Sequence, residues 1–208
     1  MLGVAAVVLA AGESSRLGTF KPLLSWPAED SAETLVSYQV RQLREAGLGP
    51  VVVVTGNRAD DVASAAVAAG ASAVHNAQFR SGKASSVRAG VDAAPEGVPL
   101  LIVGVDQPRP AAIFRQLAAV LLEGNTLVIP TYRGRRGHPP LFAAHLRAEL
   151  LAVQEEDFGL RAVVQHHAKN VTYVDIDCRL VLVNLNTPEE LTAARQLLAP
   201  HGSSPIVG

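Results

Sequence analysis

The sequence predicts an α/β protein in which a doubly wound, mostly parallel sheet lies between two layers of helices. Short apolar runs without alternation recur along the first 130 residues, as in strands that are buried on both faces. Segments with apolar residues at helical spacing separate them, which is typical of right-handed crossovers between parallel strands. The chain is 49% apolar but only 4% aromatic, so Ala, Val and Leu must fill the layers.

The elements of the first part of the chain follow in a regular order. The expected strands cover residues 4–9, 51–54, 71–75, 100–103 and 127–130. The expected helices between them cover residues 34–46, 60–69, 84–94 and 111–122. Gly47, Gly70 and Gly124 follow three of these helices, where glycine commonly ends a helix.

The pattern changes after residue 130. A stretch rich in Arg, Gly and Pro occupies residues 132–140, and further helices are expected at 143–153, 160–168 and 188–198. The apolar runs 171–176 and 180–183 predict a pair of strands. We expect one domain over residues 1–199, with two halves, 1–105 and 106–199, and a flexible tail at 200–208.

Composition narrows the classes of protein. The net charge of −1 gives no basic field that would attract nucleic acid. The single cysteine, Cys178, excludes a disulfide framework, so a cytoplasmic location is expected. The apolar run at 4–11 is far shorter than the roughly 20 residues that span a bilayer, and no basic region precedes it. We therefore expect neither a nucleic-acid partner nor a membrane partner.

The loop at residues 9–21 is the main candidate ligand site. Ligands of open α/β sheets bind beyond the carboxyl ends of the strands, and this loop follows the first strand. Ala10, Ala11 and Gly12 are small enough for the backbone to approach a ligand closely, and backbone amides there can bind an anion. Arg16 and Lys21 add two cations for phosphate oxygens. This coincidence favours phosphate binding over a solvated turn.

Two familiar phosphate-binding motifs are absent. No G-x-G-x-x-G follows the first strand. The tripeptide Gly82-Lys83-Ala84 resembles the end of a P-loop, but Ala77 stands where the motif needs glycine, and Ala84 stands where it needs Ser or Thr. The sequence therefore argues against a typical dehydrogenase and against a P-loop NTPase.

Six motifs in order resemble those of the molybdenum cofactor nucleotidyltransferases and, more broadly, of the sugar-nucleotide pyrophosphorylase-like transferases. They are Leu9-Ala-Ala-Gly-x-Ser-x-Arg16-x-Gly18-x-x-Lys21, Asn76-x-x-Phe79-x-Ser81-Gly82-x-x-x-Ser86-x-x-Ala89-Gly90, Gly104-x-Asp106-Gln107-Pro108, Gly137-His138-Pro139-Pro140-x-Phe142, Asp157-x-Gly159-x-Arg161 and Asn184-x-Asn186-Thr187-Pro188-Glu189-Glu190-Leu191. The resemblance implies a three-layer α/β/α fold, similar to that of nucleotide-diphospho-sugar transferases. It also implies transfer of a nucleotidyl group to an acceptor phosphate with release of pyrophosphate.

The resemblance assigns roles to particular residues. The expected catalytic residues are Arg16, Lys21 and Asp106. The expected nucleotide-binding residues are Leu9, Ala10, Ala11, Gly12, Arg16, Lys21, Asn57, Asn76, Gly82, Ser86 and Asp106. The expected acceptor-binding residues are Gly137, His138, Asp157 and Gly159. Three of the polar ones have a structural alternative: Ser86 begins a helix, His138 packs in a restrained loop, and Asp157 caps a helix.

Asp106 and Asn186 are the expected ligands of Mg²⁺ or Mn²⁺. Asp106 follows a buried strand, and hard cations take oxygen ligands; the alternative is that it caps the helix near Pro110. The closing motif has Asn184 and Asn186, as in the guanylyltransferase branch, where the cytidylyltransferase branch has aspartates. A second ligand here is therefore uncharged, and the alternative for both asparagines is turn formation before Pro188.

The resemblance implies a molybdopterin-type acceptor, with or without molybdenum. The Leu-Ala-Ala-Gly and Gly-His-Pro motifs accompany cytidine and the closing asparagines accompany guanosine, so we expect CTP, with GTP as the alternative. The cluster Arg133, Arg135 and Arg136 either holds the acceptor's anionic groups or is a solvated loop. Two other functions stay open: a sugar-phosphate nucleotidyltransferase, and a non-catalytic protein that delivers molybdenum cofactor to a molybdoenzyme or its chaperone.

Overall fold

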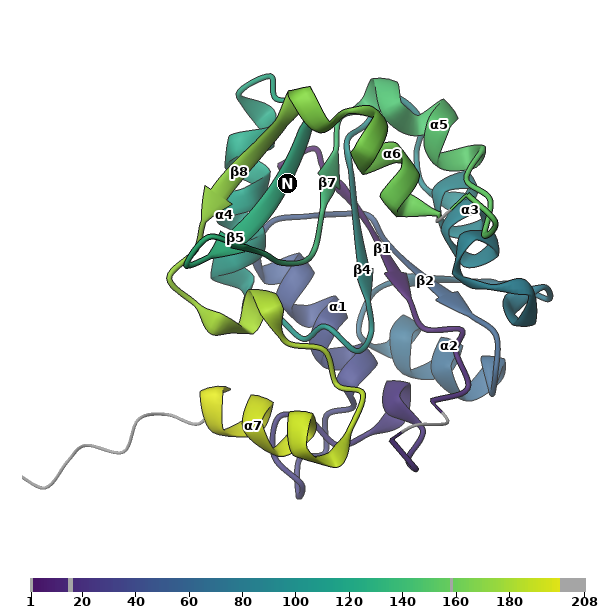
Figure 1. Cartoon of the computed structure of the whole chain (residues 1–208). Helices are drawn as coiled ribbons and strands as arrows, with labels where there is room; N and C mark the ends of the chain where they lie inside the picture. The colour runs from purple at the N-terminus through teal and green to yellow at the C-terminus, as the bar shows by residue number, and fades with distance from the viewer. Residues whose placement is uncertain (1, 15–16, 158, 199–208) are drawn as a thin grey trace, which may run out of the picture.

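The computed structural model describes residues 2–14, 17–157 and 159–198, and its helices and strands alternate along most of the chain (Figure 1). The strands are β1 (Ala5–Leu9), β2 (Val51–Thr55), β3 (Ser72–His75), β4 (Leu100–Gly104), β5 (Leu127–Tyr132), β6 (Arg135–Arg136), β7 (Leu141–Phe142) and β8 (Val171–Asp175). The helices are α1 (Leu35–Glu45), α2 (Ala59–Ala68), α3 (Lys83–Ala93), α4 (Ala111–Leu122), α5 (Arg147–Leu151), α6 (Leu160–His166) and α7 (Pro188–Leu198).

The described strands form one sheet in the order β3-β2-β1-β4-β7-β5-β6, and β8 pairs with β5. The first four strands pair in parallel, as do β5 and β8. The short strands β6 and β7 are antiparallel to their neighbours. Because β7 runs opposite to both β4 and β5, these two strands point the same way. The mostly parallel sheet that the sequence predicts is therefore confirmed.

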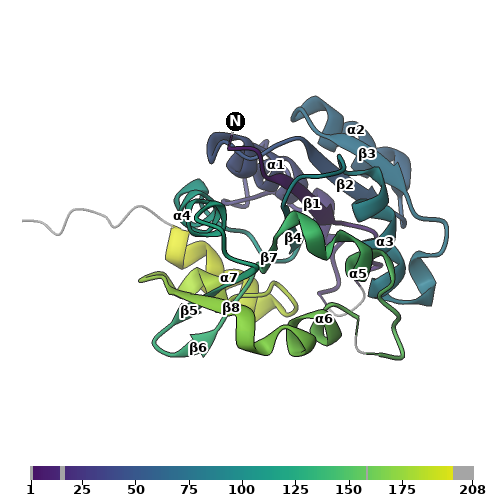
Figure 2. The same cartoon turned by 90° about the horizontal axis from the view of Figure 1, so that it is seen from above.

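Helices cover both faces of this sheet. Apolar residues of α1, α2 and α4 belong to one buried cluster, and those of α3, α5 and α6 belong to another. Figures 1 and 2 show α3, α5 and α6 together on one face, with α1 and α4 on the other. Alternate residues of β1 contribute to the two clusters, with Val8 in the first and Val7 in the second. The architecture is thus the predicted three-layer α/β/α arrangement.

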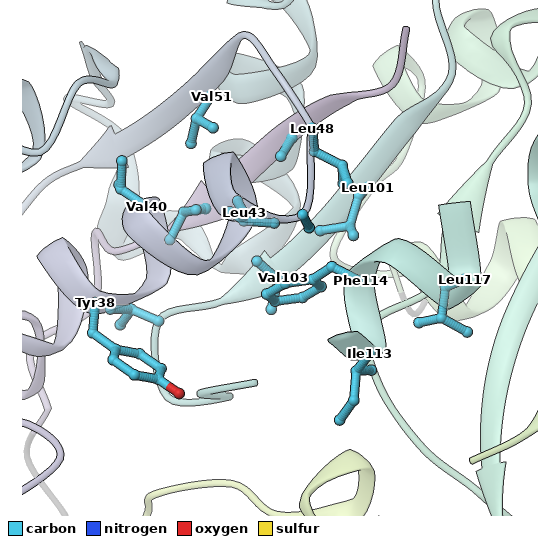
Figure 3. Close-up of a cluster of buried hydrophobic side chains, with 14 of the residues drawn as sticks. Tyr38, Val40, Leu43, Leu48, Val51, Leu101, Val103, Ile113, Phe114 and Leu117 are labelled. Carbon is cyan, nitrogen blue, oxygen red and sulfur yellow. The ribbon is translucent and has the colours of Figure 1, made fainter. Parts of the chain in front are cut away.

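The larger cluster is built mainly from aliphatic side chains, as the low aromatic content predicts. Figure 3 shows Leu43 of α1, Val103 of β4 and Phe114 of α4 in the same cluster of side chains, and all three are fully or almost fully buried. Burying such side chains contributes about 1.5–3 kcal/mol each. On the opposite face α3 approaches β1 closely at Gly90. A Cβ at this position would collide with the side chain of Val7.

The predicted strand at 180–183 is wrong. A 3₁₀ helix occupies Arg179–Leu182, and β8 pairs with β5 instead. The reason lies in the backbone carbonyl groups of this segment. Those of Val181 and Val183 accept hydrogen bonds from the side chain of Arg109, and Val181 also accepts one from the amide of His138. These oxygens are therefore not used by a strand partner.

The structure also corrects the region from 132 to 170. The Arg- and Gly-rich stretch turns at Arg133 and Gly134, which both have positive φ, and returns as β6. The predicted helix 143–153 is a 3₁₀ helix at Ala144–Leu146 followed by the short α5. The predicted helix 160–168 ends at His166, and a 3₁₀ helix follows at Ala168–Asn170.

Both predicted halves contribute to the same sheet, since β7 pairs with β4. The division after residue 105 stays a prediction, and the predicted tail at 200–208 lies outside the described residues. None of the described helices has the length and apolar character needed to cross a membrane.

Candidate active site

A cavity of about 340 Å³ opens at the carboxyl ends of β1 and β4, beside the beginning of α3. This is the edge of the sheet where the sequence places a ligand. Of the predicted site residues, eight line the cavity: Leu9, Ala11, Gly12, Lys21, Gly82, Ser86, Asp106 and Asn186. The structure therefore brings the first loop, the second motif, the Asp106 motif and the closing motif together in one place.

Lys21 lies at the centre of this cavity wall. Its backbone amide donates to the Ser14 hydroxyl at 3.0 Å, which fixes the end of the first loop. Its side-chain ammonium donates to Oδ1 of Asn186 at 2.9 Å and lies 3.8 Å from Oδ2 of Asp106. One buried cation thus connects the two predicted metal ligands. The second predicted cation of the loop, Arg16, lies outside the described residues.

Asp106 is held in a tight turn directly after β4. A Cβ at Gly104 would collide with Oδ1 of Asp106, so a larger residue there would require this carboxylate to move from its place beside the strand end. The Gln107 side chain closes the turn, because its Oε1 accepts from the Gly104 amide at 3.2 Å. Its Nε2 donates to Oδ1 of Asn184 at 2.9 Å. The predicted metal motif and the closing motif are therefore joined by a side-chain hydrogen bond.

The closing motif also begins α7. The Thr187 hydroxyl accepts from the Glu190 amide at 3.3 Å, and the Glu190 carboxylate accepts from the amides of Asn186 and Thr187 at 2.8 and 3.1 Å. This reciprocal pattern is a capping box, which satisfies free amides at a helix start. It fixes the backbone of Asn186 while leaving its side chain at the cavity. Capping and ligand binding are thus compatible roles for different groups of one motif.

Asn76 lies behind the cavity and does not line it. It is buried, and its side-chain amide donates to the hydroxyl groups of Ser85 and Ser86 at 2.9 and 3.0 Å. Its carbonyl oxygen accepts from the Gln78 amide at 2.9 Å. These bonds hold the start of α3 against the preceding loop. A nucleotide-binding role for Asn76 stays a prediction, and its structural role is to place Ser86.

Gly82 lines the cavity and lies against Glu155. Gly82 has φ +115°, and a Cβ there would meet the Glu155 side chain. Glu155 Oε2 accepts from the Ala84 amide at 2.8 Å, so an acid from the second half caps α3. Lys83 is the first residue of α3, is exposed, and lines the cavity.

Asn57 and Ala10 support the first loop from behind the cavity lining. The Asn57 amide donates to the Ala11 carbonyl at 3.1 Å, and the Ala10 amide donates to the Val54 carbonyl at 2.9 Å. Gly56 allows the segment before Asn57 to approach Ala11 this closely, because a Cβ at Gly56 would lie 2.8 Å from the Ala11 side chain. The Ala11 methyl group is therefore packed on one side and faces the cavity on the other. Contacts of Asn57 and Ala10 with a nucleotide stay predictions.

Arg109 is a residue that the sequence does not reveal. It is completely buried, and its guanidinium donates at 2.8 to 3.3 Å to the backbone carbonyl groups of Pro108, His138, Val181 and Val183. Burial lowers its pKa to about 9, and the negative charge of Asp106 opposes that shift. The group is thus charged at neutral pH. Arg109 thereby links the Asp106 turn to the His138 loop and to the segment at 181–183. In the sequence, only the prolines on either side of Arg109 draw attention to this position.

The predicted acceptor residues lie beside the cavity and not in its lining. Gly137 is buried and allows close approach to Val181, whose carbonyl group a Cβ would meet. His138 has an exposed surface, although the surrounding loops partly desolvate its ring, and its amide donates to the Val181 carbonyl at 2.8 Å. Asp157 is exposed, and Gly159, with φ +55°, precedes α6. Their role in binding an acceptor stays a prediction.

His138 lies in a positive field. Its pKa is lowered to about 4, mainly by desolvation and then by the charges of Lys83 and Arg109, with a smaller opposing effect of Asp106. The imidazole is therefore neutral at pH 7. The same field would favour an anionic ligand between α3 and the His138 loop.

The arginine cluster of the β5–β6 turn lies outside the cavity lining. Arg133, Arg135 and Arg136 are exposed. The Arg133 guanidinium lies 5.2 Å from the centre of the Tyr132 ring, and that of Arg136 lies 5.0 Å from the centre of the Tyr173 ring. These contacts favour the solvated-loop interpretation for this cluster.

A mostly parallel sheet with cations and a carboxylate at its carboxyl edge is typical of α/β proteins that bind anionic ligands such as nucleotides. Comparison with known proteins narrows this class. The profile of the MobA-like NTP transferase domain matches residues 6–171. The molybdenum cofactor cytidylyltransferase of Escherichia coli is 22% identical over 199 residues, which cover 94% of this chain and 97% of that protein.

Solved structures agree with this match. A nucleotidyl transferase from Methanothermobacter thermautotrophicus superposes with a TM-score of 0.77 at 26% identity, covering 93% of this chain and 96% of the other. A Mycobacterium tuberculosis protein in complex with manganese gives a TM-score of 0.72 at 22% identity, covering 93% and 98%. The 4-diphosphocytidyl-2C-methyl-D-erythritol synthase of Anaerococcus prevotii gives 0.69 at 12% identity, covering 95% and 96%.

The chain belongs to the MobA-like NTP transferase domain family and is a nucleotidyltransferase. The resemblance that the six motifs indicate is thereby confirmed at the level of the family.

Proposed function

We propose that this protein transfers CMP from CTP to the phosphate of a molybdopterin-type acceptor and releases pyrophosphate. The observation that carries the proposal is the convergence of Lys21, Asp106 and Asn186 at one cavity wall. A cation, a carboxylate and an amide oxygen in contact form a site for a triphosphate and a divalent cation.

The proposed reaction needs no nucleophile from the protein. An oxygen of the acceptor phosphate attacks the α-phosphorus of CTP, a new phosphoanhydride bond forms, and the bond between the α-phosphorus and the bridging oxygen breaks as pyrophosphate leaves. Catalysis then rests on positioning and on neutralising charge. Lys21 holds the triphosphate, and we assign the same role to Arg16.

The side chains at the cavity fit a single divalent cation. Mg²⁺ in proteins is usually held by one or two carboxylates together with phosphate oxygens, and Asp106 and Asn186 supply one carboxylate and one neutral oxygen close to the same ammonium. When bound, Mg²⁺ or Mn²⁺ would neutralise charge on the phosphate groups. The manganese complex of the mycobacterial neighbour supports this choice.

The first loop supports cytidine over guanosine. The Ala11 methyl group is wedged between Gly56 and the cavity, which leaves less room for a base than glycine would. The smaller pyrimidine suits that space, and the Escherichia coli relative is named for cytidylyl transfer. We assign nucleotide binding to the whole predicted set, with Leu9, Gly12, Gly82 and Ser86 at the cavity and with Ala10, Asn57 and Asn76 behind it.

The acceptor would lie between α3 and the His138 loop. We assign its binding to Gly137, His138, Asp157 and Gly159, which all belong to the second half of the chain. The positive field of Lys83 and Arg109 at His138 suits the phosphate of such an acceptor. In this proposal residues 1–105 bind the nucleotide and residues 106–199 bind the acceptor within one domain.

A pyrophosphate-release assay tests the proposal. The protein is incubated with Mg²⁺ and either CTP or GTP, with and without molybdopterin. We expect pyrophosphate only when CTP and molybdopterin are both present. Faster release with GTP would show a guanylyltransferase, and turnover with a sugar phosphate would show the broader transferase activity. Nucleotide binding in calorimetry without any pyrophosphate release would indicate a non-catalytic delivery protein.

A further inference from the structure

Glu149 of α5 and the histidines at the end of α6 form a cluster away from the cavity. Oε2 of Glu149 lies 3.1 Å from Nδ1 of His166, and Oε1 lies 2.8 Å from Nε2 of His167. These potential ligand atoms all lie within 4.8 Å of one another. The helices α5 and α6 are neighbours in both views (Figures 1 and 2).

The cluster lies at the opposite edge of the sheet from the cavity. His167 stands shortly before β8, whose first residue, Val171, pairs with Leu127 at the beginning of β5. The cavity lies instead at the carboxyl ends of β1 and β4. A ligand at Glu149 would therefore be separate from the nucleotide site.

The backbone at the end of α6 directs both rings to one carboxylate. Neighbouring side chains in a continuous helix point in different directions. Here the helix ends at His166, and His167 follows with φ −97° and ψ 22°. The two ring centres are consequently only 4.8 Å apart. A favourable interaction of a histidine with the helix dipole does not require this convergence.

We propose that Glu149, His166 and His167 bind one Zn²⁺ ion, or a chemically similar transition-metal ion, at a site that joins α5 to α6. Two imidazole nitrogens and a carboxylate oxygen are a common zinc ligand set, with water in the fourth position. Bond lengths near 2.0–2.1 Å in a tetrahedron place ligand atoms about 3.3 Å apart. The two ring nitrogens lie 3.1 and 2.8 Å from different oxygens of the carboxylate, and the ligand atoms all lie within 4.8 Å of one another, so binding requires only a small adjustment of these side chains.

The exposure of the three side chains fits this arrangement. His167 is largely buried, with 17% of its side chain exposed, and Glu149 has 36% exposed. His166, with 75% exposed, leaves the outer side open to a water ligand. Imidazole ligands select Zn²⁺, Cu²⁺ or Ni²⁺ over Mg²⁺.

The test measures Zn²⁺ binding to the full chain without an affinity tag, after treatment with a chelator. Competition with a chromogenic chelator should show one Zn²⁺ per chain in the wild type. The His167→Ala and Glu149→Gln variants should each bind at least about tenfold more weakly. The matched control is His75→Ala, an exposed histidine on β3, which should bind like the wild type. Equal affinity in the wild type, H167A and E149Q would overturn the proposal.

Two further measurements separate this site from the nucleotide cavity and from a folding defect. Zn²⁺ should raise the thermal unfolding midpoint of the wild type and of Asp106→Asn, because a ligand of the native state stabilises it. It should not raise that of H167A or of the second variant, His166→Ala. Loss of the tight Zn²⁺ site in D106N would place the metal at the cavity and overturn the proposal. Failure of CMP transfer would leave these results unchanged.

Discussion

Lys21 brings together residues that are far apart in the sequence, since its ammonium contacts Asn186 and lies close to Asp106. The closing motif supplies the uncharged amide of Asn186, whereas an aspartate at this position would add a second negative charge. Among these three residues, one carboxylate therefore lies beside one ammonium. The charge that attracts a divalent cation comes from Asp106 alone among these three residues, so the catalytic metal should depend on it strongly.

Replacing Asp106 by Asn should reduce pyrophosphate release by about 100-fold or more, because the carboxylate that would hold the cation is lost. The substitution keeps the size of the side chain, so the urea midpoint should change little. The control is Asp177→Asn, an exposed acid away from the cavity lining, which should keep the wild-type rate. A near-normal initial rate in D106N would contradict the assignment of Asp106.

Lys83 is a second cation at this cavity, since it begins α3 and its charge reaches His138. We predict that Lys83→Met raises KM for the acceptor about tenfold or more, because a hydrogen bond to a charged group contributes about 1.5–3 kcal/mol. KM for CTP should stay nearly unchanged. Steady-state kinetics with each substrate varied in turn measure the two constants, with Lys169→Met as the exposed control. A rise in KM for CTP alone would place Lys83 on the triphosphate.

His138 should influence stability in acid. Its pKa falls from an ordinary value of 6.5 to about 4 on folding, so between these values the unfolded chain binds more protons than the native chain. Stability that His138 contributes is thus lost as the pH falls from 6.5 to 4. We predict a shallower decline of the urea midpoint over this range in His138→Gln. In His75→Gln the decline should match the wild type, and an identical slope in H138Q would reject the prediction.

At the scale of elements, the start of α7 positions Asn186. The capping box of Thr187 and Glu190 holds this junction, and loss of such a cap costs about 0.5–2 kcal/mol. We therefore predict that Thr187→Ala lowers the free energy of unfolding by about 1 kcal/mol, measured with urea. The control is Thr192→Ala, whose hydroxyl donates to the Pro188 carbonyl within the same helix. A loss in T192A as large as in T187A would argue against the cap.

Elements with local signals could be predicted from the sequence. β1 is an unbroken apolar run, and α1 has Thr34 as its N-cap and Gly47 after its end. Other segments depend on distant partners. The run at 180–183 looks like a strand, but its carbonyl groups are taken by Arg109. β7 is two residues long and exists only because β4 and β5 lie on either side of it.

The residues of the site also divide into those with a local signal in the sequence and those that depend on distant partners. Lys21 and Asp106 could be placed together because both follow strands of a parallel sheet, whose carboxyl ends share one edge. The structure adds Arg109 and Lys83, which carry no comparable signal. Burial of an arginine depends on carbonyl groups from three separate segments, and the direction of Lys83 depends on how α3 starts. Neither is a property of the neighbouring sequence.

At the scale of the whole molecule, two features join the nucleotide side of the cavity to the acceptor side. One is the sheet, in which β7 lies between β4 and β5. The other is Arg109, which follows the Asp106 turn and reaches the His138 loop and the segment at 181–183. The reacting groups of nucleotide and acceptor must be held within a few tenths of an ångström. Arg109 is the residue best placed to hold the two loops in register.

Replacing Arg109 by Met should therefore destabilise the fold and disturb both substrate sites. Its removal leaves buried carbonyl groups with fewer donors, and each buried acceptor left unsatisfied typically costs about 1–3 kcal/mol. Arg109→Lys keeps the charge but cannot donate in as many directions, so it should fold, with raised KM for both CTP and acceptor. Urea unfolding and steady-state kinetics measure these effects.

The matched control is Arg115→Met on α4, where an exposed guanidinium donates to the Glu45 carbonyl at 2.8 Å. Because water replaces that donor, R115M should lose less than about 1 kcal/mol. If R109M were as stable as R115M, the buried guanidinium would not be what holds the Asp106 turn to the His138 loop. If R109K raised only one of the two KM values, Arg109 would position one loop alone, and the coupling of nucleotide and acceptor sites would rest on the sheet.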